Sequence, residues 1–384
     1  MRNTFFLLAL AAASQAVAVS PYISKVYEYR PAPGQFINVL PEIPAEASAD
    51  EVNALVLEQI GHEKNAGMIS LGAFGGYVVF GFDHPVVNVE GAYDFKIYGN
   101  AFMSASATNG GSCEPGIVMV SEDINGDGLP NDPWYELAGS EYHKDSTFKG
   151  FRITYHKTPA DHQHVADPAN RHITDTEYIR FTTNQPGYES GWLQQNVYHR
   201  QNYWPEWTDA ETLEFEGSRL ADNSTDTSGN GTYWVLGFYD YGYVDNLSND
   251  VEPGFKIDWA VDADGNPVKL GKIDFIKVYT AVSQTCGWIG ETSTEICGGE
   301  DLHPDALGVE GTEAASFGIG LIAAREGTLT VRSGSSAPFA LFTSGGAKAL
   351  EGVLAEGDNS IDASRLPSGV YLLHAAGKTL KVCL

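Results

Sequence analysis

The chain contains 384 residues, and its 23 basic and 50 acidic side chains give a formal net charge of −27. So negative a surface disfavours binding to nucleic acid or to anionic membranes, and it suits a protein in a calcium-containing medium. Because 384 residues exceed one typical domain, we expect two or more domains.

Residues 1–18 have the pattern of a cleaved signal peptide. A basic Arg2 precedes an apolar run from Phe5 to Ala13, and Ala16-Val17-Ala18 is a typical cleavage sequence. The run is too short to span a bilayer, and no other stretch of the chain is apolar for long enough. We therefore expect a secreted protein or one on the outer cell surface.

One helix is predicted between Ser48 and Asn65, where apolar residues recur at helical spacing: Val52, Leu55, Val56 and Ile60. Ser48 is a natural N-cap, and Glu51 completes a capping box. Gly61 or Gly67 would end the helix.

Most of the remaining first 300 residues read as short strands that are rich in β-branched and aromatic residues and separated by Gly, Asn, Asp and Pro. Their spacing predicts an antiparallel sandwich without βαβ units. We expect strands at Tyr77–Phe82, Phe95–Tyr98, Gly116–Val120, Phe151–His156, Tyr178–Thr182, Tyr233–Tyr239, Phe255–Val261 and Lys272–Thr280.

The segment from Ser121 to Leu137 carries acidic and amide side chains at every second position, with Gly126 and Gly128 available for tight reversals. Calcium takes six to eight oxygen ligands, often from such a loop. The segment resembles the short acidic calcium loops of thrombospondin type-3-like and dockerin-like sequences. The predicted ligands are Asp123, Asn125, Asp127, the backbone carbonyl of Leu129, and Asp132. The alternative is a solvated turn between two strands.

Aromatic side chains are densest between Trp192 and Trp207. Exposed rings stack on sugar faces, and polar neighbours hydrogen-bond the hydroxyls. The predicted glycan-binding residues are Arg200, Tyr203, Trp204 and Trp207. The alternative is that these rings fill the core of the sandwich, because Trp and Tyr are largely buried on average.

Other candidate groups are less specific. His162 and His164 are spaced to face one side of a strand and bind zinc, but no third ligand has diagnostic spacing, which favours an exposed polar loop. Cys286 and Cys297 flank a turn and are the favoured disulfide pair in an exported chain. Hydrolysis would need a pair of carboxylates, but the chain is too acidic to single one out among Asp94, Glu114, Asp258 and Asp274. No motif of a serine hydrolase, zinc protease or phosphate-binding loop occurs.

Residues 298–317 are small, acidic and poor in large apolar side chains, which is typical of a linker. A weakly charged β pattern follows from about Gly318. It contains Leu329-Thr330-Val331, Asn359-Ser360-Ile361-Asp362 and Leu366-Pro367-Ser368-Gly369-Val370-Tyr371, and it ends in Gly377-Lys378-Thr379-Leu380-Lys381-Val382. This segment resembles the C-terminal sorting domain of the bacterial type IX secretion system. The resemblance implies a small Ig-like sandwich over residues 318–384, with the type IX secretion machinery as its partner.

Residues 70–295 resemble a group of uncharacterised bacterial cell-surface proteins. The similarity is carried by SLGAFGGYVVFGFDHPVVNVEGAYDFKIYGNAF and EPGIVMVSEDINGDGLPNDPWYELAGSEY, and by the segments Asp258–Asp262 and Asp274–Tyr279. The resemblance implies a jelly-roll-like β-sandwich and, for members encoded beside nutrient-uptake genes, an outer-membrane uptake partner.

The sequence therefore predicts an all-β protein with a jelly-roll-like antiparallel β-sandwich over residues 19–297, a linker, and an Ig-like sorting domain. Its expected role is non-catalytic binding of an extracellular glycan or other nutrient, with calcium stabilising the fold. The alternatives are a glycan-active hydrolase that uses a carboxylate pair, and a structural or adhesive surface protein.

Overall fold

A computed structural model describes residues 19–304 apart from 66, 106 and 108, residue 306, and residues 319–383 apart from 326–327, 334–335, 344–346, 368 and 376–377. The chain divides into one unit that ends at Pro304 and a second that begins at residue 305. The predicted signal peptide and most of the predicted linker lie outside the described residues. Within the described part, no helix is long and apolar enough to cross a membrane.

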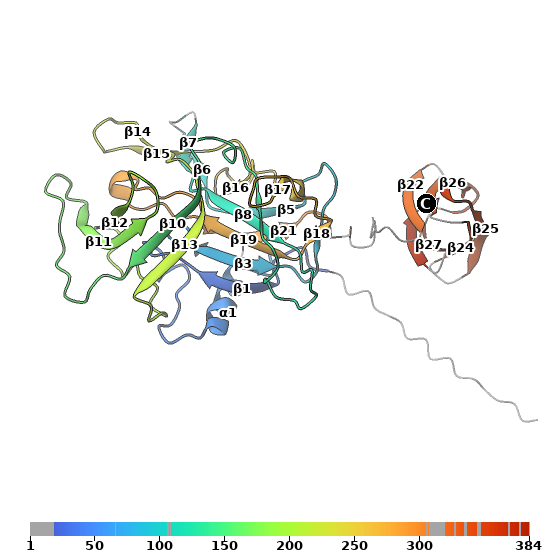
Figure 1. The fold of residues 1–384 in the computed structure, drawn as a ribbon, viewed down its shortest axis with the longest axis horizontal. Coiled ribbons are helices and arrows are strands. Elements are labelled where there is room, and N and C mark those ends of the chain that lie inside the picture. Colours follow the sequence, from blue (N-terminus) through green and yellow to red (C-terminus); the bar gives the residue numbers. More distant parts are fainter. Residues whose placement is uncertain are drawn as a thin grey trace, which may run out of the picture. The chain divides into compact units, whose positions relative to one another are not determined.

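The first unit is built on two antiparallel sheets (Figure 1). The larger has the order β1 (Lys25–Arg30), β3 (Tyr77–Gly81), β19 (Phe275–Thr280), β8 (Gly116–Ser121), β9 (Tyr135–Leu137) and β17 (Ala260–Val261), with β16 (Tyr243–Val244) also paired to β8. The smaller has the order β12 (Ser190–Asn196), β11 (Ile173–Thr183), β10 (Phe148–His156) and β13 (Thr212–Arg219).

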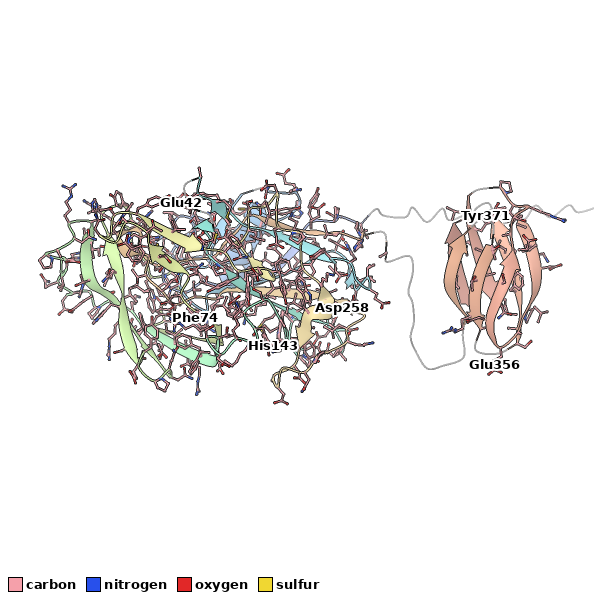
Figure 2. The ribbon with its side chains drawn as sticks, turned by 90° about the horizontal axis from the view of Figure 1, so that it is seen from above. Glu42, Phe74, His143, Asp258, Glu356 and Tyr371 are labelled. Carbon is pink, nitrogen blue, oxygen red and sulfur yellow. The ribbon has the colours of Figure 1, made fainter. Side chains whose placement is uncertain are left out.

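The central strands β3, β19 and β8 bury both of their faces. Successive side chains along a strand point to opposite faces of the sheet. Ile117 and Tyr279 pack against the smaller sheet, in a core that includes Phe74, Phe151 and Tyr155 (Figure 2 labels Phe74). Their neighbours on the opposite face form a second core with the helix: Val78, Val118, Ile276 and Val278 with Val52, Val56 and Ile60. The two sheets therefore form a sandwich whose larger sheet is also covered from outside.

The predicted helix is confirmed as α1, Ala49–Ile60. The Ser48 side chain accepts a hydrogen bond from the Glu51 backbone N–H, and the Glu51 carboxylate accepts one from the Ser48 N–H at 2.9 Å, which completes the capping box. Gly61 ends the helix. Its apolar stripe covers the outer face of the larger sheet next to β1 (Figure 1).

Short strand pairs complete the first unit. They are β14 (Ser224–Asp226), β15 (Trp234–Gly237), β7 (Gly110–Ser112) and β6 (Phe102–Met103) in one sheet; β18 (Lys272–Ile273) with β4 (Val86–Val87); β2 (Ile69–Ser70) with β20 (Glu295–Ile296); and β21 (Gly298–Asp301) with β5 (Phe95–Tyr98).

The structure corrects three sequence-based expectations. Phe255–Val261 is not one strand, because a 3₁₀ turn at Ile257–Trp259 precedes the two residues of β17. The first unit extends beyond residue 297, since β21 pairs with β5 inside it. Cys286 and Cys297 are free thiols rather than a disulfide pair.

The second unit is a small β-sandwich (Figure 2). One sheet contains β22 (Ile319–Arg325), β23 (Thr328–Ser333) and β26 (Gly357–Asp362); the other contains β25 (Lys348–Leu354), β24 (Ala337–Thr343), β27 (Val370–Ala375) and β28 (Lys378–Cys383). Its own core includes Leu329, Leu341 and Leu373, all of them buried. The prediction of an all-β sandwich protein is therefore confirmed, while the role of this unit in sorting stays a prediction.

Replacing Ile276 tests the double burial of the central strands. Ile276 is 1% exposed and lies in β19, a central strand of the larger sheet. We expect Ile276→Ala to lower the free energy of unfolding by roughly 2–5 kcal/mol, because a cavity remains where the side chain was. The matched control is Ile124→Ala, at a position that is 64% exposed, for which we expect a change within about 0.5 kcal/mol. Urea denaturation measures both, and equal effects would contradict the described core.

Candidate functional sites

The predicted calcium loop connects β8 to β9, and its side chains turn inward as expected. Gly126 and Gly128 have positive φ angles of 72° and 73°. The Asp123 carboxylate accepts hydrogen bonds from the backbone N–H groups of Gly126, Asp127 and Gly128 at 2.8–3.1 Å. Asp132 accepts one from Ile124 N–H at 3.2 Å. The loop thus closes on its own backbone donors, which is turn chemistry. Calcium binding by Asp123, Asn125, Asp127, Leu129 and Asp132 stays a prediction.

The predicted aromatic platform does not form. Tyr203 is fully buried and Trp204 is 2% exposed, both in the core between the two sheets. The Tyr203 hydroxyl donates a hydrogen bond to the His199 carbonyl at 3.0 Å. These rings pack against apolar neighbours and offer no face to a dissolved sugar, so the expectation of an exposed stacking site at Tyr203 and Trp204 is wrong.

The other two predicted ligand residues lie apart from each other. Trp207 is partly buried against the outer core and stacks on Tyr29, with ring centres 6.1 Å apart. Arg200 is exposed and lines a different cavity, which it shares with His162 and His164. These residues are close in the sequence, but in the fold they line different pockets.

A group of carboxylates that sequence reasoning did not assemble is the stronger candidate. One carboxylate oxygen from each of Glu114, Asp245 and Glu295 lies within 4.8 Å of the other two. Glu114 precedes β8, Asp245 follows β16, and Glu295 begins β20. The Asp245 backbone is left-handed, with a φ of 55°. Such a conformation is uncommon outside glycine and is often found at functional sites.

Backbone contacts hold Asp245 in place. Its two carboxylate oxygens accept hydrogen bonds from the Asn100 and Glu295 N–H groups at 2.8 and 3.0 Å. The Asp245 carbonyl accepts the Glu114 N–H at 2.8 Å. Gly99 permits this close approach, because a Cβ there would lie 2.7 Å from the Asp245 Cα. The geometry of the carboxylates is therefore fixed by main-chain contacts.

Burial raises the pKa of each of these carboxyls. Burial and the nearby Asp245 raise the pKa of Glu114 well above its usual range, and burial with Glu114 does the same for Glu295. Burial raises the pKa of Asp245 to about 7. The ionised forms are disfavoured because they are removed from water and lie beside like charges.

Glu291 adds a fourth buried carboxyl with an unused oxygen. Glu291 is 2% exposed, and its Oε1 accepts a hydrogen bond from the Gln35 backbone N–H at 2.8 Å. Its Oε2 is buried without a hydrogen-bond partner among the described residues. Burial raises the pKa of Glu291 to about 8. Because buried polar atoms are nearly always paired, an orphaned carboxyl oxygen indicates a missing partner such as a water or an ion.

Three of these carboxyls line one cavity of about 390 Å³, which we call the carboxylate pocket. Glu114, Glu291 and Glu295 share it with the rings of Phe36, Phe102, Tyr233 and Trp234. Phe102 is 60% exposed and Tyr233 is 44% exposed, so the pocket combines buried acids with accessible aromatic faces. Perturbed titratable groups inside a concave aromatic site are the usual mark of a binding or catalytic centre.

Comparison with protein families found none that matches the chain, and comparison with curated proteins found no match. Among solved structures, the chain is similar to a β-glucuronidase of Faecalibacterium prausnitzii at 9% identity and a TM-score of 0.18. The match covers 74% of this chain and 47% of that enzyme, so the chain spans about half of the enzyme's length. A TM-score that low supports no shared fold or activity.

The raised pKa of Glu291 predicts how stability depends on pH. Its folded pKa of about 8 lies above the ordinary value, so the folded state holds an extra proton between the two values. The free energy of unfolding that this proton contributes is fully present below the ordinary pKa and is lost as pH rises through about 8. Between pH 5 and pH 8 in EDTA, we expect the parent to lose roughly 2 kcal/mol or more of unfolding free energy relative to Glu291→Gln. Urea denaturation at several pH values gives the comparison.

The exposed Glu90→Gln is the matched control and should follow the parent at every pH. Parallel curves for the parent and Glu291→Gln would show that Glu291 titrates normally in the folded protein.

Proposed function

We propose that the first unit is an extracellular binding domain that takes a glycan in the carboxylate pocket with the help of a divalent cation. The observation that supports it is the convergence of Glu114, Asp245 and Glu295 within 4.8 Å beside accessible aromatic rings. Calcium binds oxygens at about 2.3–2.6 Å, so oxygens up to about 5 Å apart fit around one ion. The unpartnered Glu291 oxygen in the same pocket supports a missing ligand independently.

The aromatic residues supply the second half of the proposed recognition. Phe102 and Tyr233 present rings that stack on the apolar face of a sugar. A bound calcium leaves coordination positions that sugar hydroxyls fill, while the carboxylates neutralise its charge. In this proposal, the stacking role expected of Tyr203 and Trp204 passes to Phe102 and Tyr233.

Hydrolysis is the second candidate, and one observation favours it. A glycosidase needs a carboxyl that stays protonated near neutral pH as its general acid, and Glu291 with a pKa of about 8 meets that requirement. Glu114 or Glu295 would then be the second carboxylate. Shorter glycan products that appear with the parent and are absent with Glu291→Gln would favour the hydrolase.

Export and surface location remain part of the proposal. The second unit has its own core and the β-sandwich architecture expected of a type IX sorting domain. We propose that it delivers the first unit to the outer surface, where an outer-membrane uptake partner receives the bound nutrient. Failure of a chain lacking residues 318–384 to leave the periplasm would support this role.

Calcium titration of the mature chain tests the cation. At 100 times its dissociation constant, calcium stabilises by about 2.7 kcal/mol, which for a unit of this size is a rise in melting temperature of roughly 4–5 °C. We expect Glu114→Gln to abolish the rise. Asp123→Ala with Asp127→Ala should abolish it only if the ion sits in the loop between β8 and β9. No rise in the parent would remove both calcium proposals.

Glycan-array binding with and without EDTA tests the ligand. We expect Phe102→Ala and Tyr233→Ala to lose glycan binding and keep the calcium-induced rise in melting temperature. Tyr241→Ala, at a ring that is 43% exposed and does not line the pocket, is the control and should bind as the parent does. Parent protein that binds no glycan would favour the structural or adhesive alternative.

A further inference from the structure

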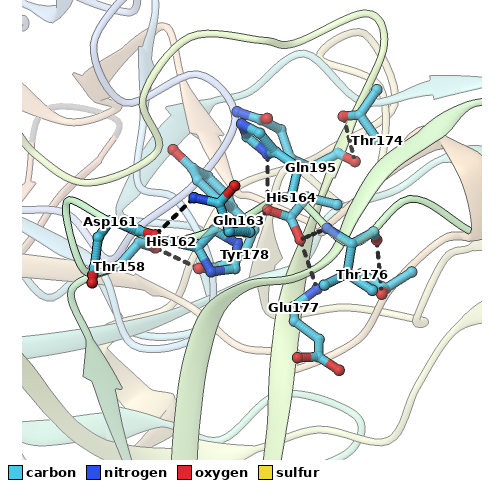
Figure 3. A network of polar contacts seen from close by, with 12 residues as sticks. Thr158, Asp161, His162, Gln163, His164, Thr174, Thr176, Glu177, Tyr178 and Gln195 are labelled. Atoms are coloured by element: carbon cyan, nitrogen blue, oxygen red, sulfur yellow. Dashed lines mark hydrogen bonds and ion pairs between the residues drawn. The ribbon is translucent and has the colours of Figure 1, made fainter.

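Two histidines lie close to a buried aspartate near the beginning of β11 in the smaller sheet. His162 and His164 lie on the connection between β10 and β11, and Asp175 lies in β11. The Asp175 Oδ2 atom is 2.6 Å from His162 Nε2 and 3.0 Å from His164 Nδ1 (Figure 3). Asp175 is a candidate third metal ligand beside the two histidines, and its spacing in the sequence did not reveal it.

Backbone N–H groups hold the Asp175 carboxylate in place. Its Oδ1 accepts the backbone N–H groups of Val165 and Glu177 at 3.2 and 3.0 Å. Its Oδ2 faces only the two imidazoles among the described hydrogen bonds and ion pairs. Hydrogen bonds of this kind orient carboxylates that act as metal ligands in other proteins.

The donor set suits zinc. Zinc binds histidine nitrogens and carboxylate oxygens at about 2.0–2.2 Å, and catalytic or exchangeable sites use three protein ligands with one position open. Three ligand atoms within 4.8 Å of one another, two of them nitrogens, match that set. Calcium, by contrast, prefers oxygen ligands alone.

The histidines also open onto solvent-accessible space. His162 and His164 line an open cavity of about 650 Å³, together with Tyr178, Gln195, Arg200 and Asn202. The His164 side chain is 64% exposed and that of His162 is 18% exposed. A metal held here would have its free coordination position toward the cavity, where water or an oxygen ligand can reach it.

We propose that His162, His164 and Asp175 form a zinc site with an open coordination position that faces this cavity. The site is separate from the carboxylate pocket, and the proposal does not depend on the proposed glycan-binding function. The competing explanation is a metal-free clip, in which both imidazoles donate hydrogen bonds to Asp175 and fasten the connection to β11.

Zinc titration of the tag-free, chelator-treated mature chain tests the proposal. By isothermal calorimetry we expect one equivalent of zinc to bind, and the affinity to fall at least tenfold in His162→Ala with His164→Ala and in Asp175→Asn. Affinity should also weaken at acidic pH, because the imidazoles must lose their protons to bind metal. Cobalt in place of zinc should give the visible absorption of a low-coordinate site in the parent and not in the His162→Ala/His164→Ala or Asp175→Asn variants.

Two controls separate a metal site from general effects. His143→Ala removes an exposed histidine elsewhere and should bind zinc as the parent does. Circular dichroism confirms that each variant is folded. A parent that binds no zinc, or variants that bind it with unchanged affinity, would overturn the proposal in favour of the clip.

Discussion

The double burial of β3, β19 and β8 is the constraint on which the first unit depends. Most side chains on both faces of these strands are apolar, and they pack in the core with the smaller sheet on one side and in the core with α1 on the other. Burying polar groups in either core without partners is costly, which favours strand ends and connections for them. Glu114 and Asp245 lie directly beside the ends of β8 and β16. The packing that excludes acids from the two cores is compatible with their clustering at strand ends, as Glu114, Asp245 and Glu295 do.

Such a cluster of buried acids is stable in only two forms, one protonated and one with a bound cation. An ionised carboxylate loses its hydration on burial, and close like charges add to that cost. Either the carboxyls keep protons, as the raised pKa values of Asp245 and Glu291 indicate, or a cation replaces the protons. Protons and a cation then compete for the same oxygens, so cation affinity rises with pH. With the proposed cation bound, one cluster of residues would link the stability of the fold, the protonation of the carboxyls and ligand binding.

Local signals in the sequence determined what could be predicted. The α1 boundaries follow from the capping box at Ser48 and from Gly61, which are all near neighbours. Most of the expected strands occur because alternating β-branched and aromatic residues specify them locally. Phe255–Val261 has the same composition, yet Asp94 accepts the Ile257 N–H at 2.7 Å and this tertiary contact replaces strand pairing there.

The candidate sites could not be predicted in the same way, because their residues converge only through the fold. Glu114 and Glu295 are far apart in the chain, and nothing in their flanking residues marks them as partners. Asp175 lies in a strand, where an acid is unremarkable until two histidines face it. Burial of Tyr203 and Trp204 likewise depends on the smaller sheet closing over them. Segments of the sequence that are rich in one type of residue therefore identified neither the carboxylate pocket nor the cluster of His162, His164 and Asp175.

Hydrogen-bond accounting separates the acidic groups that look alike in sequence. In the loop after β8, Asp123 already receives three backbone N–H groups, so binding an ion there must compete with the turn itself. Asp175 divides its oxygens between backbone donors and imidazoles. Glu291 keeps a buried oxygen with no described partner, which the fold leaves unsatisfied at a cost of about 1–3 kcal/mol. A ligand that supplies the missing partner would recover that free energy on binding, so we propose the carboxylate pocket rather than the loop after β8 as the cation site.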